Sequence, residues 1–152
     1  MTYAVRNVKI VTPFRIIQNG SVIVTGKKIS ALGSVQDVKI PSSMKSYDMN
    51  GMILTTGFID VLFHGGGGAG FEDDNEESIG TVSEFFFEHG TTGLLASLYS
   101  KPLKLLVKDV ARIAKYVDSH KDTNVKGIHM EGPFINPEMK GAMKEEYLWK
   151  PD

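Results

Sequence analysis

The chain has 152 residues, of which 41% are hydrophobic and 23% charged, and this composition excludes a disordered tail or a fibre in favour of a folded globular protein. Seventeen Lys and Arg residues against eighteen Asp and Glu residues leave a formal charge of −1, so no field of one sign is available to bind nucleic acid or an anionic membrane. The absence of cysteine excludes disulfides, thiolate zinc sites and a cysteine nucleophile, so any metal must bind to histidine and carboxylate ligands.

Residues 1–52 have the pattern of a small β-sheet, because short β-branched runs alternate with turn residues and no helical period is sustained. Asn19-Gly20 is a turn signal, and Gly26-Lys27-Lys28 is typical of a tight connection into a strand over 29–32. The N-terminal residues carry charges and no long apolar run, which excludes a signal peptide and a membrane span. We therefore expect a cytoplasmic protein, with a first domain over 1–52 and a second over 53–152.

Residues 53–152 alternate buried strands with amphipathic helices. Strands are predicted over 56–64, 92–99 and 125–130, and the first is apolar enough to be covered on both faces. A first helix is predicted from a cap at Asp73 or Asp74 to His89. The second helix follows Pro102, and its apolar stripe consists of Leu103, Leu106, Val107, Val110, Ala114 and Val117.

The order β-α-β-α-β predicts parallel strands joined by right-handed crossovers. Two architectures fit this order, an open doubly wound sheet or the first units of an eight-fold (β/α)8 TIM-type barrel. A complete barrel needs about 250 residues, or about 30 for each unit. Three strands and two helices at this spacing would be a part of such a barrel, with open strand edges and an uncovered apolar face.

Polar side chains at the carboxyl ends of the predicted strands are the candidates for chemistry, because parallel sheets bind ligands there. His64 ends the first strand and Glu131 ends the third. The intervening strand carries the small residues Ala96 and Ser97, so His64 and Glu131 are expected on the same rim. One imidazole and one carboxylate make half of a metal site. His129 is compatible with either face of its strand.

Glycines 65, 67 and 70 match the G-x-G-x-x-G pattern between a strand and a helix. The carboxylates that follow, over 72–77, would repel a pyrophosphate at the helix start that should attract it. The second predicted strand also lacks an acidic residue at its end to hold a ribose hydroxyl. These residues disfavour a dinucleotide-dependent oxidoreductase.

Taken together, these motifs resemble the N-acetylglucosamine-6-phosphate deacetylases of the amidohydrolase superfamily. The stretch from Gly57 to Asp60, followed by His64 and its glycines, is similar to that family's first barrel strand and glycine loop. The stretch GIHMEGPFINPEMKGA, from Gly127 to Ala142, is similar to the family signature G-x-H-x-E-G-P-F-I-N-P-x-x-x-G-A. The resemblance covers the whole chain and implies that residues 1–52 are the N-terminal part of a small β-sandwich domain.

The resemblance implies removal of the acetyl group from N-acetylglucosamine 6-phosphate by a metal-activated water, giving glucosamine 6-phosphate and acetate. It assigns Glu131 and His64 to metal binding and Ala142 and Met143 to the loop that contacts the sugar. The implied cofactor is one divalent metal, zinc or iron, in each active site of the complete enzyme. The implied partner is the sugar phosphate, with a homodimer expected at full length.

Three positions depart from the family pattern, the least of them Thr56, where the family usually has proline. Leu62 replaces the first histidine of an H-x-H pair, and Met143 replaces a histidine after Gly-Ala. The resemblance places the catalytic aspartate and two further metal histidines on later strands, so no catalytic residue is assigned within this chain. We therefore expect an N-terminal segment that is inactive by itself. The alternative is a non-catalytic remnant that binds a sugar phosphate or a protein partner.

Overall fold

The chain forms two compact units, Met1–Thr56 and Gly57–Asp152, in a computed structural model that describes residues 1–150. The division lies four residues after the expected boundary at 52/53. The reason is a short strand, β5 (Ile53–Thr55), which pairs in parallel with Lys9–Val11 of the first unit. Each unit has a core of its own, and each is described separately.

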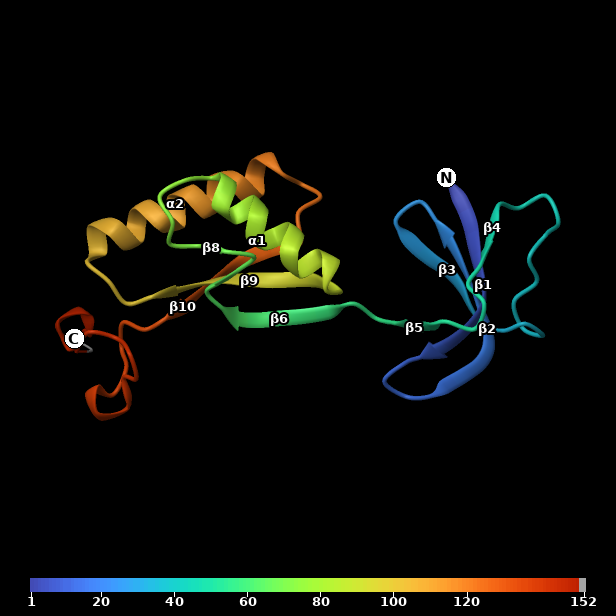
Figure 1. The fold of residues 1–152 in the computed structure, drawn as a ribbon, viewed down its shortest axis with the longest axis horizontal. Helices are drawn as coiled ribbons and strands as arrows, with labels where there is room; N and C mark the ends of the chain where they lie inside the picture. The colour runs from blue at the N-terminus through green and yellow to red at the C-terminus, as the bar shows by residue number, and fades with distance from the viewer. Residues whose placement is uncertain (151–152) are drawn as a thin grey trace. The chain divides into compact units, whose positions relative to one another are not determined.

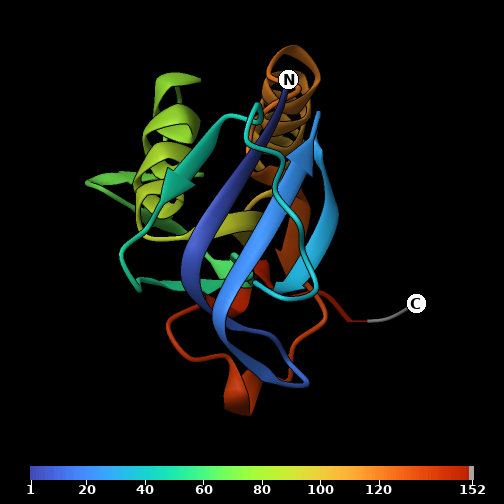
Figure 2. The ribbon, with the colours of Figure 1, turned by 90° about the vertical axis from the view of Figure 1, so that its right-hand side faces the viewer.

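The first unit is a five-stranded sheet (Figures 1 and 2). Its other strands are β1 (Thr2–Val11), β2 (Ile16–Thr25), β3 (Lys28–Ser34) and β4 (Ser46–Asp48), in the order β3-β2-β1-β4. Strands β1, β2 and β3 are joined as antiparallel neighbours, whereas β4 and β5 pair in parallel with β1. Val8, Ile10 and Val22 are the buried apolar centre of this sheet.

Two expectations for the first unit need correction. Asn19-Gly20 is not a turn but lies inside β2, where the register with β1 shifts between Val8 and Ile10. Asn19 adopts a φ of 47° there, which asparagine tolerates better than most residues, so the signal marks a β-bulge. The polar stretch after β3 contains β4, a strand that the sequence pattern did not predict. The expected tight connection is present but one residue shorter, because Lys28 already belongs to β3.

The second unit is built on a three-stranded parallel sheet with the order β10-β9-β6. Its strands are β6 (Phe58–Phe63), β9 (Thr91–Tyr99) and β10 (Val125–Glu131), and its helices are α1 (Glu77–Glu88) and α2 (Leu103–Ser119). Both helices lie along one face of the sheet (Figure 1). The short strands β7 (Gly65–Gly66) and β8 (Ala69–Gly70) and the 3-10 turns η1 (Pro137–Met139) and η2 (Glu145–Tyr147) complete it. The predicted β-α-β-α-β order is confirmed.

Local sequence explains how the first helix begins. The Asn75 Oδ1 accepts a hydrogen bond from the Ser78 N–H at 2.7 Å, which satisfies a donor at the start of α1. Asp73 and Asp74, the expected caps, make other contacts. Asp73 accepts from the Gly70 N–H, and Asp74 pairs with Lys108 of α2.

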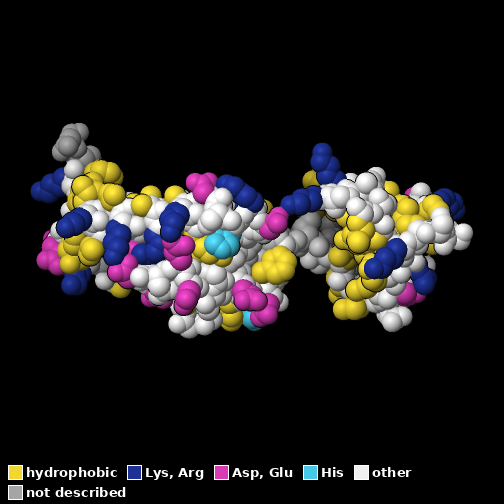
Figure 3. Space-filling model, turned by 90° about the horizontal axis from the view of Figure 1, so that it is seen from above, with side chains coloured by type: hydrophobic (Ala, Val, Ile, Leu, Met, Phe, Trp, Pro, Cys, Tyr) yellow, Lys and Arg dark blue, Asp and Glu magenta, His cyan; other side chains and the backbone are white. Residues whose placement is uncertain are grey.

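The buried face of α2 differs in part from the predicted stripe. Leu106 is buried and Val110 and Val117 pack against the core, whereas Leu103 and Val107 are exposed. The buried positions that the apolar pattern missed are Asp109, Ile113 and Tyr116. The outer surface of both helices carries interspersed acidic and basic side chains (Figure 3). Lys108 and Lys115 of α2 form ion pairs with Asp74 and Glu76, which precede α1.

The three strands of the second unit do not close into a barrel within the described residues. Strand β6 was expected to be covered on both faces, but it is an edge strand, with Phe58 65% and Ile59 78% exposed. No described element pairs with the outer backbone edge of β6. No described element covers the side chains of Phe58 and Ile59 either. Among residues 1–150, no helix is both long and apolar enough to cross a membrane.

Candidate functional site

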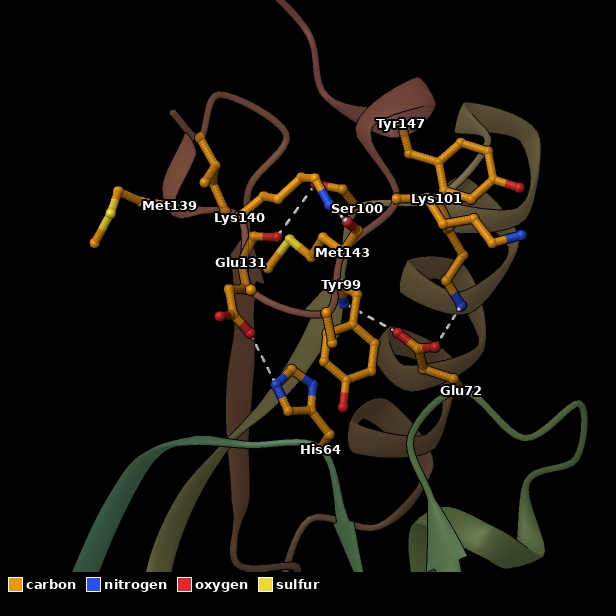
Figure 4. A pocket seen from close by; sticks show the side chains of 14 residues that line it. His64, Glu72, Tyr99, Ser100, Lys101, Glu131, Met139, Lys140, Met143 and Tyr147 are labelled. Carbon is orange, nitrogen blue, oxygen red and sulfur yellow. Dashed lines mark hydrogen bonds and ion pairs between the residues drawn. The ribbon is translucent and has the colours of Figure 1, made fainter. Parts of the chain in front are cut away.

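A pocket of about 650 Å3 lies at the carboxyl ends of the three parallel strands (Figure 4). Strand β6 supplies His64 immediately after its end, β9 supplies Tyr99 and β10 supplies Glu131. The segment that follows β10 forms the opposite wall with Ile135 and residues 139–144. The pocket therefore contains all four residues to which sequence analysis gave a binding role: His64, Glu131, Ala142 and Met143.

His64 and Glu131 are in direct contact, as the positions of their strand ends predict. The His64 Nε2 lies 2.9 Å from the Glu131 Oε2, with both side chains partly exposed. The His64 Nδ1 lies 3.1 Å from the Ser97 carbonyl oxygen. Both ring nitrogens thus face acceptors, although a neutral imidazole carries a single N–H.

The donors that the pocket offers do not complete a metal site. Structural and catalytic zinc sites use at least three protein ligands, whereas His64 and Glu131 are two. No group of three or more His, Cys, Asp or Glu side chains suited to a metal occurs among residues 1–150. Leu62, at the position of the first histidine in the H-x-H pattern, is half exposed on β6 and has no lone pair to offer. The described residues can therefore contribute to a metal site but cannot form one alone.

The sugar-binding loop that the resemblance predicts is folded over the pocket. Met143 is buried, and its N–H donates to the Lys140 carbonyl oxygen at 3.1 Å. The Lys140 Nζ in turn donates to the Met143 carbonyl oxygen at 3.1 Å. Ala142 is exposed beside them. The loop begins at Gly132, whose peptide bond to Pro133 is cis.

The pocket is also lined by charged and aromatic side chains that the sequence pattern did not predict, namely Glu72, Tyr99 and Lys101. The Tyr99 ring stacks on the His64 ring, with centroids 3.6 Å apart and planes inclined by 16°. The Tyr99 N–H donates to the Glu72 Oε1 at 2.9 Å, and the Glu72 Oε2 lies 3.3 Å from the Lys101 Nζ. Burial, and then the charges of Glu72 and Glu131, raise the pKa of the Tyr99 phenol above its ordinary value of 10.0. The position of Tyr99 at a strand end was the available signal.

The glycine pattern after His64 has a structural explanation that does not involve a nucleotide. Strands β7 and β8 pair antiparallel, Gly65 with Gly70 and Gly66 with Ala69. The two residues between them, Gly67 and Gly68, have φ values of 65° and 84°. A two-residue hairpin with positive φ at both central positions requires such residues. The glycines therefore form a hairpin, consistent with the sequence argument against a dinucleotide loop.

The remaining histidines lie outside the pocket lining. The His129 Nδ1 lies 3.2 Å from the Ser97 Oγ, so its ring contacts β9, the neighbouring strand. His89 follows α1 and its Nδ1 lies 2.7 Å from the Phe85 carbonyl oxygen. His120 stacks on Tyr116 at the end of α2, with centroids 4.0 Å apart.

Comparisons with known proteins find N-acetylglucosamine-6-phosphate deacetylases among both the curated proteins and the solved structures. An N-acetylglucosamine-6-phosphate deacetylase of Haemophilus influenzae is 30% identical over 149 residues, which cover 97% of this chain and 38% of that protein. The crystal structure of the deacetylase from Pasteurella multocida matches with a TM-score of 0.89 and 31% identity over all of this chain and 40% of that one. The deacetylase structure from Thermotoga maritima matches with a TM-score of 0.80 and 27% identity, covering 98% and 37%. No family model matches the chain.

Proposed function

The chain is a homologue of the N-acetylglucosamine-6-phosphate deacetylases that spans about 40% of their length, and from this premise we propose that it contributes part of the active site of such an enzyme. The proposed reaction is hydrolysis of the acetamido group of N-acetylglucosamine 6-phosphate to glucosamine 6-phosphate and acetate. The three strands and two helices of the second unit would then be the first units of a (β/α)8 barrel. The first unit would be part of the accompanying β-sandwich domain.

One observation carries this proposal: the four residues assigned by resemblance line one pocket. In the complete enzyme, Glu131 and His64 would hold a divalent metal, zinc or iron, together with ligands that the described residues do not supply. Ala142 and Met143 would contact the sugar from the loop after β10. Met143 offers an apolar side chain to a sugar ring, but it cannot donate the hydrogen bond that a histidine there would donate.

The charge of the pocket supports an anionic substrate. Its lining includes Lys101, Lys140 and Lys144 against Glu72 and Glu131. Lys101 is paired with Glu72 and Asp109. The Lys140 Nζ donates to the Met143 carbonyl oxygen, which is uncharged. The Lys144 Nζ lies 3.9 Å from the Glu146 Oε1. A sugar phosphate would therefore add negative charge beside Lys140, which contacts an uncharged oxygen.

Acetate release from N-acetylglucosamine 6-phosphate tests the proposal. We expect no activity from the 152-residue chain by itself, because its described residues supply two candidate metal ligands. We expect activity from a complete enzyme that contains this chain, and loss of that activity in Glu131→Gln. Glu138→Gln, which changes an exposed carboxylate on η1, is the matched control and should retain activity. Acetate release by the 152-residue chain alone would contradict the ligand argument.

A second candidate function is binding of a sugar phosphate without hydrolysis. Leu62 and Met143 favour it, because both replace side chains that could bind a metal or donate a hydrogen bond. Calorimetric titration of the chain with N-acetylglucosamine 6-phosphate separates the two functions when it is paired with the acetate assay. Binding by a complete protein that releases no acetate would support the second function.

A further inference from the structure

The contacts of the His64 ring depend on a residue that has no assigned role. Tyr99 is the last residue of β9, and its Cα is paired in register with that of Glu131 on β10. On the other side, the last register pair between β6 and β9 joins Phe63 to Ala96. Tyr99 therefore extends beyond the end of β6. Its ring covers the face of the imidazole at 3.6 Å, which limits the rotation of His64 about its side-chain bonds.

On the side of β6, the backbone of Tyr99 is held by a side chain instead of a neighbouring strand. Beyond the end of β6, the Tyr99 N–H donates to the Glu72 Oε1 at 2.9 Å. Glu72 comes two residues after β8, in the segment that leads to α1. Just before it, the Phe71 N–H donates to the His64 carbonyl oxygen at 2.9 Å. The 71–72 segment thus contacts His64 through its backbone and holds Tyr99, whose ring covers His64.

Charged side chains from α2 and from the residues just before it hold that segment in place. The Lys101 Nζ bridges the Glu72 Oε2 at 3.3 Å and the Asp109 Oδ2 at 2.5 Å. The Asp109 Oδ1 lies 2.8 Å from the Arg112 Nη1. Arg112 connects these ion pairs back to the 71–72 segment, because its Nη2 donates to the Phe71 carbonyl oxygen at 2.7 Å. Lys101, Asp109 and Arg112 are almost entirely buried, where ion pairs are screened little by solvent.

We propose that Tyr99 and Glu72 are positioning residues, which hold the His64 imidazole with its Nε2 toward Glu131, and that Lys101, Asp109 and Arg112 fix Glu72. We call these five residues the positioning clamp. Its catalytic relevance rests on the proposed function, because the clamp orients a candidate metal ligand. A ligand orientation fixed by surrounding groups is a general feature of metal sites. The contacts themselves can be tested without any activity.

Proton–carbon NMR of the histidine rings in the 152-residue chain tests the clamp. The sequence has four histidines, so each ring can be assigned by single substitution. In the unmodified chain we expect upfield ring-proton shifts for His64 and His120, because each stacks on a tyrosine. We also expect nuclear Overhauser cross-peaks from His64 to the Tyr99 ring and to Glu131. Absence of the His64–Tyr99 cross-peak would overturn the proposal before any variant is made.

Variants separate positioning from general folding. Tyr99→Leu should abolish the upfield shift of His64 and its cross-peak to Glu131, while the His120 signals stay unchanged as an internal reference. Glu72→Ala should weaken the same two signals because the Tyr99 N–H loses its acceptor. Glu72→Gln should largely restore them, since its amide oxygen still accepts. Glu76→Ala is the matched control, because Glu76 pairs with the same helix through Lys115 and should leave His64 unchanged.

The proposal is overturned if His64 keeps its shift and its cross-peak to Glu131 in Tyr99→Leu and Glu72→Ala. It is also overturned if Glu72→Gln disturbs His64 as much as Glu72→Ala does. Loss of the His120 shift in Tyr99→Leu would show that this variant unfolds the second unit. In that case the proposal is tested by comparing Glu72→Ala with Glu72→Gln and by the His64–Tyr99 cross-peak of the unmodified chain. A complete enzyme that released no acetate would contradict the proposed function and leave each of these NMR results unaffected.

Discussion

Replacement of Asp109 by asparagine should destabilise the second unit strongly, although the change is isosteric. Asp109 is 7% exposed and bridges two cations, the Lys101 Nζ at 2.5 Å and the Arg112 Nη1 at 2.8 Å, whose side chains are 15% and 9% exposed. Loss of one partner from a buried ion pair costs about 3–5 kcal/mol, because it leaves an uncompensated charge. Lys101 keeps Glu72, and Arg112 keeps the Phe71 carbonyl oxygen. We therefore expect the lower end of this range, about 3 kcal/mol.

Urea unfolding measures this loss in the second unit specifically. Both helices, α1 and α2, belong to that unit, as does Trp149, which is the one tryptophan of the sequence. Far-ultraviolet circular dichroism and tryptophan fluorescence therefore follow its unfolding. With a denaturant slope of roughly 1–3 kcal/mol per molar, the unfolding midpoint should fall by roughly 1–3 M.

The matched control is Glu76→Gln, which removes a more exposed ion pair between the segment before α1 and the same helix. The side chains of Glu76 and Lys115 are 40% and 72% exposed, and surface pairs contribute about 0–1 kcal/mol. If Asp109→Asn and Glu76→Gln differ in unfolding free energy by less than about 1 kcal/mol, burial does not determine the cost of losing these ion pairs.

Three further predictions concern ionisation and backbone conformation. Because the pKa of Tyr99 is raised, the folded state keeps the phenol proton at a pH where the unfolded chain loses it. The free energy of unfolding should therefore fall as pH rises above 10.0. An ultraviolet titration should show one late-ionising tyrosine that is absent in Tyr99→Phe. The hydrogen bond from Lys108 lowers the pKa of Asp74 below 3.8, so its stabilisation is present above pH 3.8 and is lost as pH falls through the folded pKa. The difference in urea midpoint between Asp74→Asn and the unmodified chain should then vanish in acid, and a difference that persisted would contradict the assignment. Gly132→Ala should destabilise the pocket loop by about 1–3 kcal/mol, because Gly132 has a φ of 100° and an added methyl carbon would lie 2.0 Å from the Ser100 Oγ; unchanged urea unfolding would show that the loop adapts.

The contact between His64 and Glu131 was predictable because it depends on strand order. Adjacent parallel strands end on one edge, and the small residues Ala96 and Ser97 leave room between them. The β-α-β-α-β order was predictable for a similar reason, since strand and helix periods are local properties of the sequence.

The positioning clamp was not predictable in the same way. Asp109 is buried only because two cations neutralise it, so an apolar stripe on α2 cannot reveal it. Glu72 reaches Tyr99 only after the hairpin of β7 and β8 has turned the chain back, and the five carboxylates over 72–77 gave no sign of their separate partners. In the first unit, β4 was missed because three exposed residues, Ser46–Asp48, carry no alternating pattern.

The pairing of β5 with β1 determines where the gene can be divided. A polypeptide that stopped at residue 52, the boundary predicted from sequence texture, would lose the partners of Lys9, Ile10 and Val11. The backbone amides and carbonyls freed on β1 would then be available to the same strand in a neighbouring molecule. Truncation at 52 should therefore yield material prone to precipitation, whereas truncation at 56 preserves the sheet that the first unit needs.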